Sequence, residues 1–173
     1  ASSGVHSNGL TLARHVFSRD AGWTLDSHVE DFGRTVGEEL LEPTRMYVKL
    51  ALDLLATADV RGLAHITGDG LLNLRRFEAE VGFEIDALPE ANPVFQVLQR
   101  MGNVSPAEMY RVFNMGVGFC AVVPESDVDA ALAAGKREGF ECWRIGTAAA
   151  SSDRVIHLAQ HGLASKDEKF VQS

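Results

Sequence analysis

The sequence is poor in cysteine and has no long apolar run. Its 173 residues include only Cys120 and Cys142. Each lies in an apolar stretch, which favours buried thiols in a reducing cytoplasm over a disulfide framework. No apolar run approaches the roughly 20 residues of a membrane-spanning helix, and the first residues lack the charged and apolar regions of a signal peptide. We therefore expect a cytoplasmic protein with no membrane contact.

Basic residues are also scarce. The chain has 16 Lys and Arg against 24 Asp and Glu, a formal net charge of -8, which argues against a broad nucleic-acid surface. There is no CxxC, HExxH or EF-hand pattern, so we expect no metal site. The 46% hydrophobic and 23% charged residues are typical of a folded globular protein long enough to bury a core.

Helical spacing alternates with strand-like runs along the chain. Periodicity and capping signals predict helices over 10–22, 35–41, 47–55, 71–77, 93–101, 106–113 and 128–135. Apolar or alternating runs predict strands over 63–66, 81–87, 115–123, 140–147 and 155–158, of which 115–123 has the composition of a central strand buried on both faces. These elements predict an α+β domain, a mixed sheet covered by helices, over residues 1–160. The remaining residues, 161–173, are expected to form a loose polar tail.

The stretch GLAHITGDG at 62–70 is the strongest candidate for a functional site. An apolar strand ends at His65, and a glycine turn then leads into a helix. Backbone N–H groups in such a turn bind anions, so Thr67, Gly68 and Gly70 are candidates to hold a phosphate. An ordinary tight turn is the alternative.

Four stretches together carry a family resemblance: HSNG at 6–9, EPTRMYV at 42–48, GLAHITGDG at 62–70 and EMYRVFNMGVGF at 108–119. The chain resembles the carboxyl-terminal half of phosphoribosylformylglycinamidine cyclo-ligase, also called aminoimidazole ribonucleotide synthetase. The resemblance implies an ATP-dependent ring closure on formylglycinamidine ribonucleotide in purine biosynthesis. It also implies that ATP and Mg²⁺ are held by an amino-terminal domain absent from this chain, and that the fragment alone is inactive.

The resemblance places two histidines, His6 and His65, near the substrate. Imidazole titrates near neutral pH and can move protons or position a ligand. The alternatives are that His6 bonds to a helix end and that His65 is a core histidine. Ser7, Asn8 and Gly9 are expected to present polar groups to the substrate, and Ser7 or Asn8 also suits the N-cap of the first helix.

Four further residues are candidate ligand contacts. Arg45 offers a planar donor fork to an anion, with a surface ion pair to Glu38 or Glu42 as the alternative. Asp69 stands where the family commonly has a third glycine, and it either caps the next helix or contacts Mg²⁺ or a ribose hydroxyl. Asn114 and Gly116 precede a strand where ligand contact and packing against another domain or subunit are both open.

The expected partners are a small ribonucleotide, the absent amino-terminal domain and a second copy in a homodimer, with an exposed apolar patch near the two histidines. Related ATP-dependent enzymes with the same architecture are alternatives: selenophosphate synthetase, thiamine-monophosphate kinase, the hydrogenase-maturation dehydratase and formylglycinamidine synthetase. An alternative of another class is a non-catalytic module that binds a ligand or a partner chain.

Overall fold

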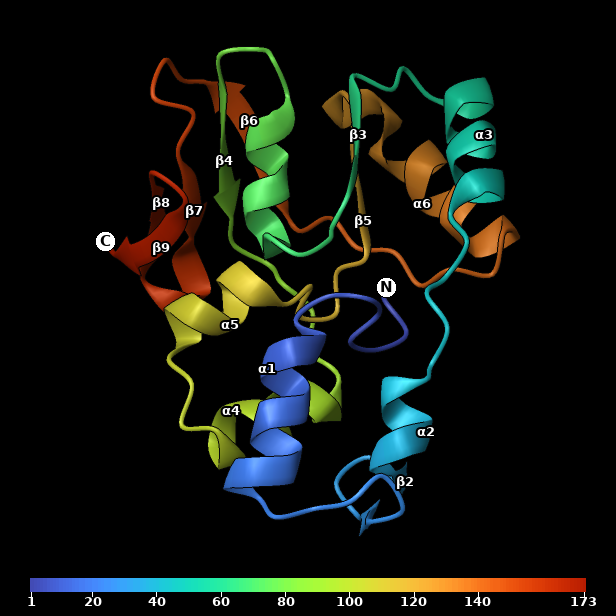
Figure 1. The fold of residues 1–173 in the computed structure, drawn as a ribbon. Coiled ribbons are helices and arrows are strands. Elements are labelled where there is room, and N and C mark those ends of the chain that lie inside the picture. The colour runs from blue at the N-terminus through green and yellow to red at the C-terminus, as the bar shows by residue number, and fades with distance from the viewer.

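A computed structural model describes residues 1–173 of the protein (Figure 1). The helices are α1 (Leu10–His15), continued as a π-helix over Val16–Asp20, α2 (Val36–Leu40), α3 (Val48–Thr57), α4 (Pro93–Met101), α5 (Pro106–Val112) and α6 (Val128–Arg137), with 3₁₀ turns at Gly70–Arg76, Glu125–Asp127 and Ala159–His161. The strands are β1 (His28–Val29), β2 (Arg34–Thr35), β3 (Gly62–His65), β4 (Val81–Ile85), β5 (Phe119–Val122), β6 (Gly146–Ala150), β7 (Ile156–Leu158), β8 (Leu163–Lys166) and β9 (Lys169–Gln172).

The strands form one mixed sheet and two short ladders. The five-stranded sheet has the order β6-β4-β7-β8-β9, in which only β4 and β7 are parallel. The strands β3 and β5 pair antiparallel, with His65 opposite Phe119, and β1 pairs with β2. In Figure 1 the sheet and the β3-β5 ladder lie above α1, α2 and α4, and α3 and α6 lie beside β5. The expected mixed α+β architecture is confirmed.

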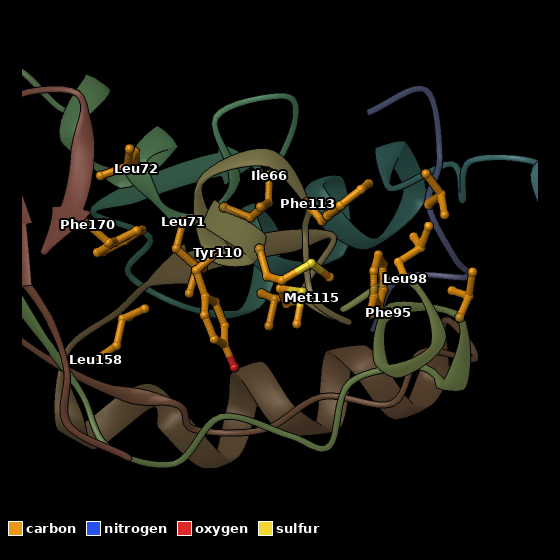
Figure 2. Close-up of a cluster of buried hydrophobic side chains, with 14 of the residues drawn as sticks. Ile66, Leu71, Leu72, Phe95, Leu98, Tyr110, Phe113, Met115, Leu158 and Phe170 are labelled. Atoms are coloured by element: carbon orange, nitrogen blue, oxygen red, sulfur yellow. The ribbon is translucent and has the colours of Figure 1, made fainter. Parts of the chain in front are cut away.

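One large core joins the sheet to the helices. Fully buried side chains come from α4, α5, the 3₁₀ turn after β3 and the strands β7 and β8, and Figure 2 shows Phe113 and Met115 near the centre of this core. A smaller cluster of Tyr47, Leu50, Leu54 and Ala134 joins α3 to α6. Burying such side chains stabilises the fold by roughly 1.5 to 3 kcal/mol each.

Capping residues and prolines in the sequence correctly predicted where two helices begin. Ser105 caps α5 by accepting a hydrogen bond from the Glu108 N–H at 3.3 Å, and Pro106 occupies the first turn. The helix α4 begins at Pro93 and ends at Met101, as predicted. The prediction that Ser7 or Asn8 caps α1 is wrong, because the N-cap is Gly9, with a φ of 63° and no side-chain cap.

Two strand predictions are wrong. The chain at 115–118 forms a turn because Met115 and Gly116 have φ values of 48° and 94°, so β5 contains only Phe119–Val122 and leaves Ala121 exposed. The predicted strand 140–147 is irregular as far as Ile145, and β6 begins only at Gly146. Gly146 allows this start, since a Cβ there would overlap the Glu84 carbonyl of β4.

The expectation of a loose tail over 161–173 is also wrong. The strands β8 and β9 form a hairpin, and Leu163 and Phe170 are 1% and 3% exposed in the main core. On α3, Val48, Leu52 and Leu55 are exposed whereas Leu50 and Leu54 are buried. No helix has both the length and the apolar character needed to cross a bilayer.

Candidate functional site

The end of α5 brings the motifs together. A Cβ on Gly9 would overlap the Phe113 ring, and one on Gly70 would overlap the Tyr110 carbonyl. Gly9 and Gly70 both have positive φ values, 63° and 54°, which only glycine adopts without strain. The HSNG and GLAHITGDG segments therefore both pack against the end of α5. This close approach requires glycine at positions 9 and 70.

Asn114 joins the N-terminal segment to the turn before β5. Its side chain is fully buried, and Oδ1 accepts hydrogen bonds from Ser2 Oγ at 2.8 Å and from the Gly116 N–H at 2.9 Å. Its Nδ2 donates to the Gly4 carbonyl at 2.8 Å. Gly116 accepts a hydrogen bond from the Ser2 N–H at 2.8 Å. Asn114 and Gly116 thus have packing roles that account for the residue types found there.

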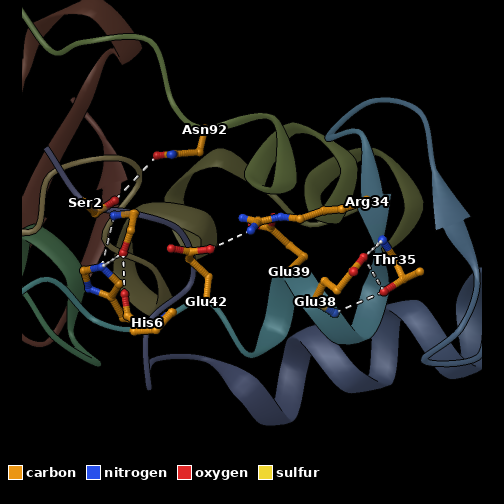
Figure 3. Close-up of polar contacts among 10 residues, drawn as sticks. Ser2, His6, Arg34, Thr35, Glu38, Glu39, Glu42 and Asn92 are labelled. Atoms are coloured by element: carbon orange, nitrogen blue, oxygen red, sulfur yellow. Dashed lines mark hydrogen bonds and ion pairs between the residues drawn. The ribbon is translucent and has the colours of Figure 1, made fainter.

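His6 belongs to the same N-terminal segment and is buried. It is 5% exposed and has a φ of 57°, which is rare for a residue with a Cβ. The Ser3 N–H donates to His6 Nε2 at 3.1 Å, and Ser3 Oγ lies 3.0 Å from the same nitrogen (Figure 3). Burial, then the positive charges of His65 and Arg45, lower the pKa of His6 to about 4. His6 is therefore uncharged at neutral pH.

His65 ends β3 beside an aromatic cluster. Its ring centroid is 5.7 Å from that of Tyr47 in an edge arrangement, and Tyr47 stacks on Phe119 at 5.1 Å. The core-histidine alternative is wrong, because His65 is exposed. Gly118 lies next to Tyr47 and His6: a Cβ there would overlap the Tyr47 hydroxyl and stand 3.3 Å from His6 Cε1. The aromatic ring of Tyr47 thus fills the space between strand and N-terminal segment.

Arg45 stands at the edge of the same cluster. Its guanidinium carbon is 5.8 Å from the centre of the Phe140 ring, and the side chain is exposed. The alternative ion pairs are wrong, because Glu42 pairs with Arg34 at 2.5 Å and Glu38 bonds to Thr35 (Figure 3). Arg45 belongs to no salt bridge, so its donor fork is available to an anion.

Internal hydrogen bonds close the glycine turn. Asn73 is 2% exposed, and its Oδ1 accepts hydrogen bonds from the Thr67 N–H and from Thr67 Oγ1, the latter at 3.0 Å. The Gly70 N–H donates to the Thr67 carbonyl at 2.8 Å. Gly68 is exposed, and a Cβ on it would touch nothing within 4 Å. Of the candidate phosphate-binding residues, only Gly68 keeps an open approach.

The carboxylate of Asp69 pairs with a basic residue of the following 3₁₀ turn. Its Oδ2 pairs with Arg76 at 2.6 Å and accepts from Asn73 Nδ2 at 3.3 Å. The prediction that Asp69 caps the following helix is wrong in its detail: Asp69 occupies the N-cap position, but its side chain bonds to no backbone N–H. Its charge is balanced locally by the Arg76 guanidinium.

Other residues of the site differ from expectation or were not foreseen. Ser7 is exposed and Asn8 is buried, directly after His6. The sequence assigned no role to Ser3, which bonds to His6, or to Asn73, which closes the glycine turn. Single short polar residues carry no signal that could have identified them. Tyr47 did carry a signal, as the residue that follows EPTR by two positions.

An apolar cavity lies beside this cluster. It has a volume of about 390 Å³ between β5, α6 and the chain at 142–148. Phe119 belongs to the aromatic cluster and also lines this cavity, and Cys120 lines the cavity beside it. Both cysteines are free, and burial raises the pKa of Cys120 to about 12. The structure contains no group of three or more His, Cys, Asp or Glu side chains that could hold a metal ion.

The fold and the site together define a mixed α+β domain in which an N-terminal segment, the end of β3 and the start of α3 share one aromatic cluster. Residues 1–158 match the family model described as AIR synthase related protein, C-terminal domain, and the chain therefore belongs to that family.

Curated relatives carry the name phosphoribosylformylglycinamidine cyclo-ligase. That of Methanothermobacter thermautotrophicus is 52% identical over 132 residues, which are 76% of this chain and 39% of the relative. That of Methanococcus vannielii is 50% identical over 128 residues, 74% of this chain and 36% of the relative. That of Carboxydothermus hydrogenoformans is 44% identical over 158 residues, 90% and 46%. The chain thus spans less than half the length of the curated relatives it matches.

Proposed function

We propose that this chain is the substrate-side part of an ATP-dependent cyclo-ligase that converts formylglycinamidine ribonucleotide to aminoimidazole ribonucleotide in purine biosynthesis. In this reaction the formyl-derived amide oxygen is activated by phosphoryl transfer, an internal nitrogen attacks, and phosphate and ADP are released. The observation that carries the proposal is the meeting of His6, His65 and Arg45 around Tyr47. The relatives' shared name supports the same reading.

The three side chains offer complementary contacts for a ribonucleotide. Arg45 presents an exposed guanidinium without a carboxylate partner, which suits a phosphate. His65 is exposed at the end of β3 beside the Tyr47 ring. His6 lies next to Gly118 and Tyr47 as an uncharged donor. We assign binding and orientation of the substrate to these residues, with Ser7, Asn8 and Gly68 at the rim.

Binding of ATP and Mg²⁺ is assigned to another part of a longer protein. These 173 residues offer no carboxylate cluster for a metal ion, and the turn at 67–70 is closed by Asn73. We therefore propose that the fragment is inactive alone and works with an amino-terminal domain in the cytoplasm. The exposed apolar side chains Leu41, Met46, Val48, Leu52 and Leu55 suit contact with that domain or with a second subunit in a homodimer.

Calorimetric titration of the chain with formylglycinamidine ribonucleotide and, separately, with ATP tests this proposal. We expect the ribonucleotide to bind and ATP not to bind. His65→Ala and Arg45→Ala should each weaken the ribonucleotide at least about tenfold, since a charge-assisted hydrogen bond contributes roughly 1.5 to 3 kcal/mol.

The matched control is His15→Ala, which removes a histidine that is 55% exposed on α1 and should leave affinity unchanged. Binding of ATP with the affinity of the ribonucleotide, or equal affinity in all the variants, would refute the assignment of this site.

A further inference from the structure

The hydrogen bonds around His6 determine which ring nitrogen carries its proton. A backbone N–H can only donate, so the Ser3 N–H at 3.1 Å requires His6 Nε2 to be an unprotonated acceptor. Ser3 Oγ, 3.0 Å from that nitrogen, also lies 2.7 Å from the Pro43 carbonyl and can donate to either. The single proton of the uncharged imidazole must then be on Nδ1.

That Nδ1–H has no partner. Its atom is buried, and no hydrogen-bond acceptor lies within reach. The residue also holds a φ of 57°, a left-handed conformation that is unfavourable for histidine. Unpaired buried donors are rare in folded proteins, and strained backbone tends to cluster at functional sites. The combination points to a group held ready for a ligand.

We propose that His6 acts as an uncharged hydrogen-bond donor whose Nδ1–H takes an oxygen acceptor of the bound ligand, a carbonyl or a phosphate oxygen, and that it does not act as a general base. This inference rests on the proposed function and deepens it. A base needs a free lone pair, and the only lone pair of the ring, on Nε2, already accepts from Ser3.

The surrounding charges favour the same state. Arg45 and His65 disfavour a cation at His6, as does the chain's amino group, and only Glu42 favours one. Because Nδ1 is buried in this structure, a ligand oxygen reaches it only when the atoms that cover it move.

Long-range ¹H–¹⁵N spectra of histidine-labelled chain test the tautomer directly, with His6 assigned from its loss in His6→Gln. We expect a protonated Nδ1 and a bare Nε2 at pH 7. An imidazolium, or a proton on Nε2, would overturn the inference. Formylglycinamidine ribonucleotide and inorganic phosphate are then added to separate samples. A shift of the Nδ1 proton with the ribonucleotide alone identifies a carbonyl acceptor, and a shift with both identifies a phosphate oxygen.

A spectrum unchanged by both probes also overturns the inference. Calorimetry on the same samples shows whether binding, and with it the proposed function, has failed as well. A matched pair of variants separates the two ring positions: asparagine places an amide N–H near Nδ1 and tolerates positive φ, whereas glutamine places its amide near Nε2. We expect His6→Asn to bind the ribonucleotide within about threefold of the parent and His6→Gln at least about tenfold more weakly. Equal losses in the two variants would contradict the donor assignment.

Discussion

Replacement of Asn114 by alanine tests whether this residue holds the N-terminal segment in place. The parent side chain makes hydrogen bonds with Ser2 Oγ, the Gly116 N–H and the Gly4 carbonyl, all between 2.8 and 2.9 Å. Each contributes about 1 kcal/mol, and a buried group left without its partner costs roughly 1 to 3 kcal/mol. Since Gly116 and Gly4 are both buried, we expect Asn114→Ala to lower the free energy of unfolding by about 4 kcal/mol.

The assay is urea unfolding followed by the fluorescence of the two tryptophans. With a slope of roughly 2 kcal/mol per molar urea, the midpoint should fall by about 2 M. Ser2→Ala removes one of the three bonds and should cost about 1 kcal/mol in the parent but almost nothing when Asn114 is already alanine. The control is Asn103→Gly, at an exposed residue with a φ of 45°, where we expect a change below about 0.5 kcal/mol.

A loss below about 1.5 kcal/mol for Asn114→Ala would refute this reasoning, because the buried bonds would then be dispensable. An undiminished effect of Ser2→Ala in the double variant would refute the assigned pairing.

Three further predictions concern pH, the glycine turn and the last strand. The free energy of unfolding should fall by up to about 3 kcal/mol as pH drops from 6.5 to 4, because His6 binds a proton in the unfolded chain over this range but not in the folded one, where its pKa is about 4. Urea midpoints measured across this range should fall less in His6→Asn than in the parent. Gly70→Ala, at a φ of 54° and against the Tyr110 carbonyl, should lose more than about 3 kcal/mol in thermal unfolding. Phe170→Ala should lose about 3 to 4 kcal/mol in urea.

Each of these has a control or a contrary result. Equal pH dependence in the parent and His6→Asn would contradict the lowered pKa. Gly68→Ala lies in the same turn with open space around it and should change stability by less than about 0.5 kcal/mol. Lys169→Ala is the exposed neighbour of Phe170 on β9, so a similar loss in both would show that burial of the aromatic ring is not the cause.

Helices with local start signals could be predicted because the signals act within one turn. Pro93 and the Ser105-Pro106 pair determined where α4 and α5 begin without reference to the rest of the chain. The strands were harder. The run at 115–123 is apolar throughout, and nothing within it shows that Met115 and Gly116 adopt positive φ to admit the Ser2–Gly4 segment beside Asn114.

The candidate site was also predictable in part: its motifs could be read from the sequence, but the contacts around them could not. The motifs at 6–9, 42–48 and 62–70 are local strings, so the sequence by itself determined the family and named His6, His65 and Arg45. Their surroundings depend on contacts between residues far apart in the sequence, such as Tyr47 with His65 and with Phe119. The charge of His6 was decided only by tertiary structure, because burial and the nearby His65 and Arg45 lower its pKa. Its tautomer depends on a local turn that the sequence did not reveal, in which the Ser3 N–H donates to Nε2.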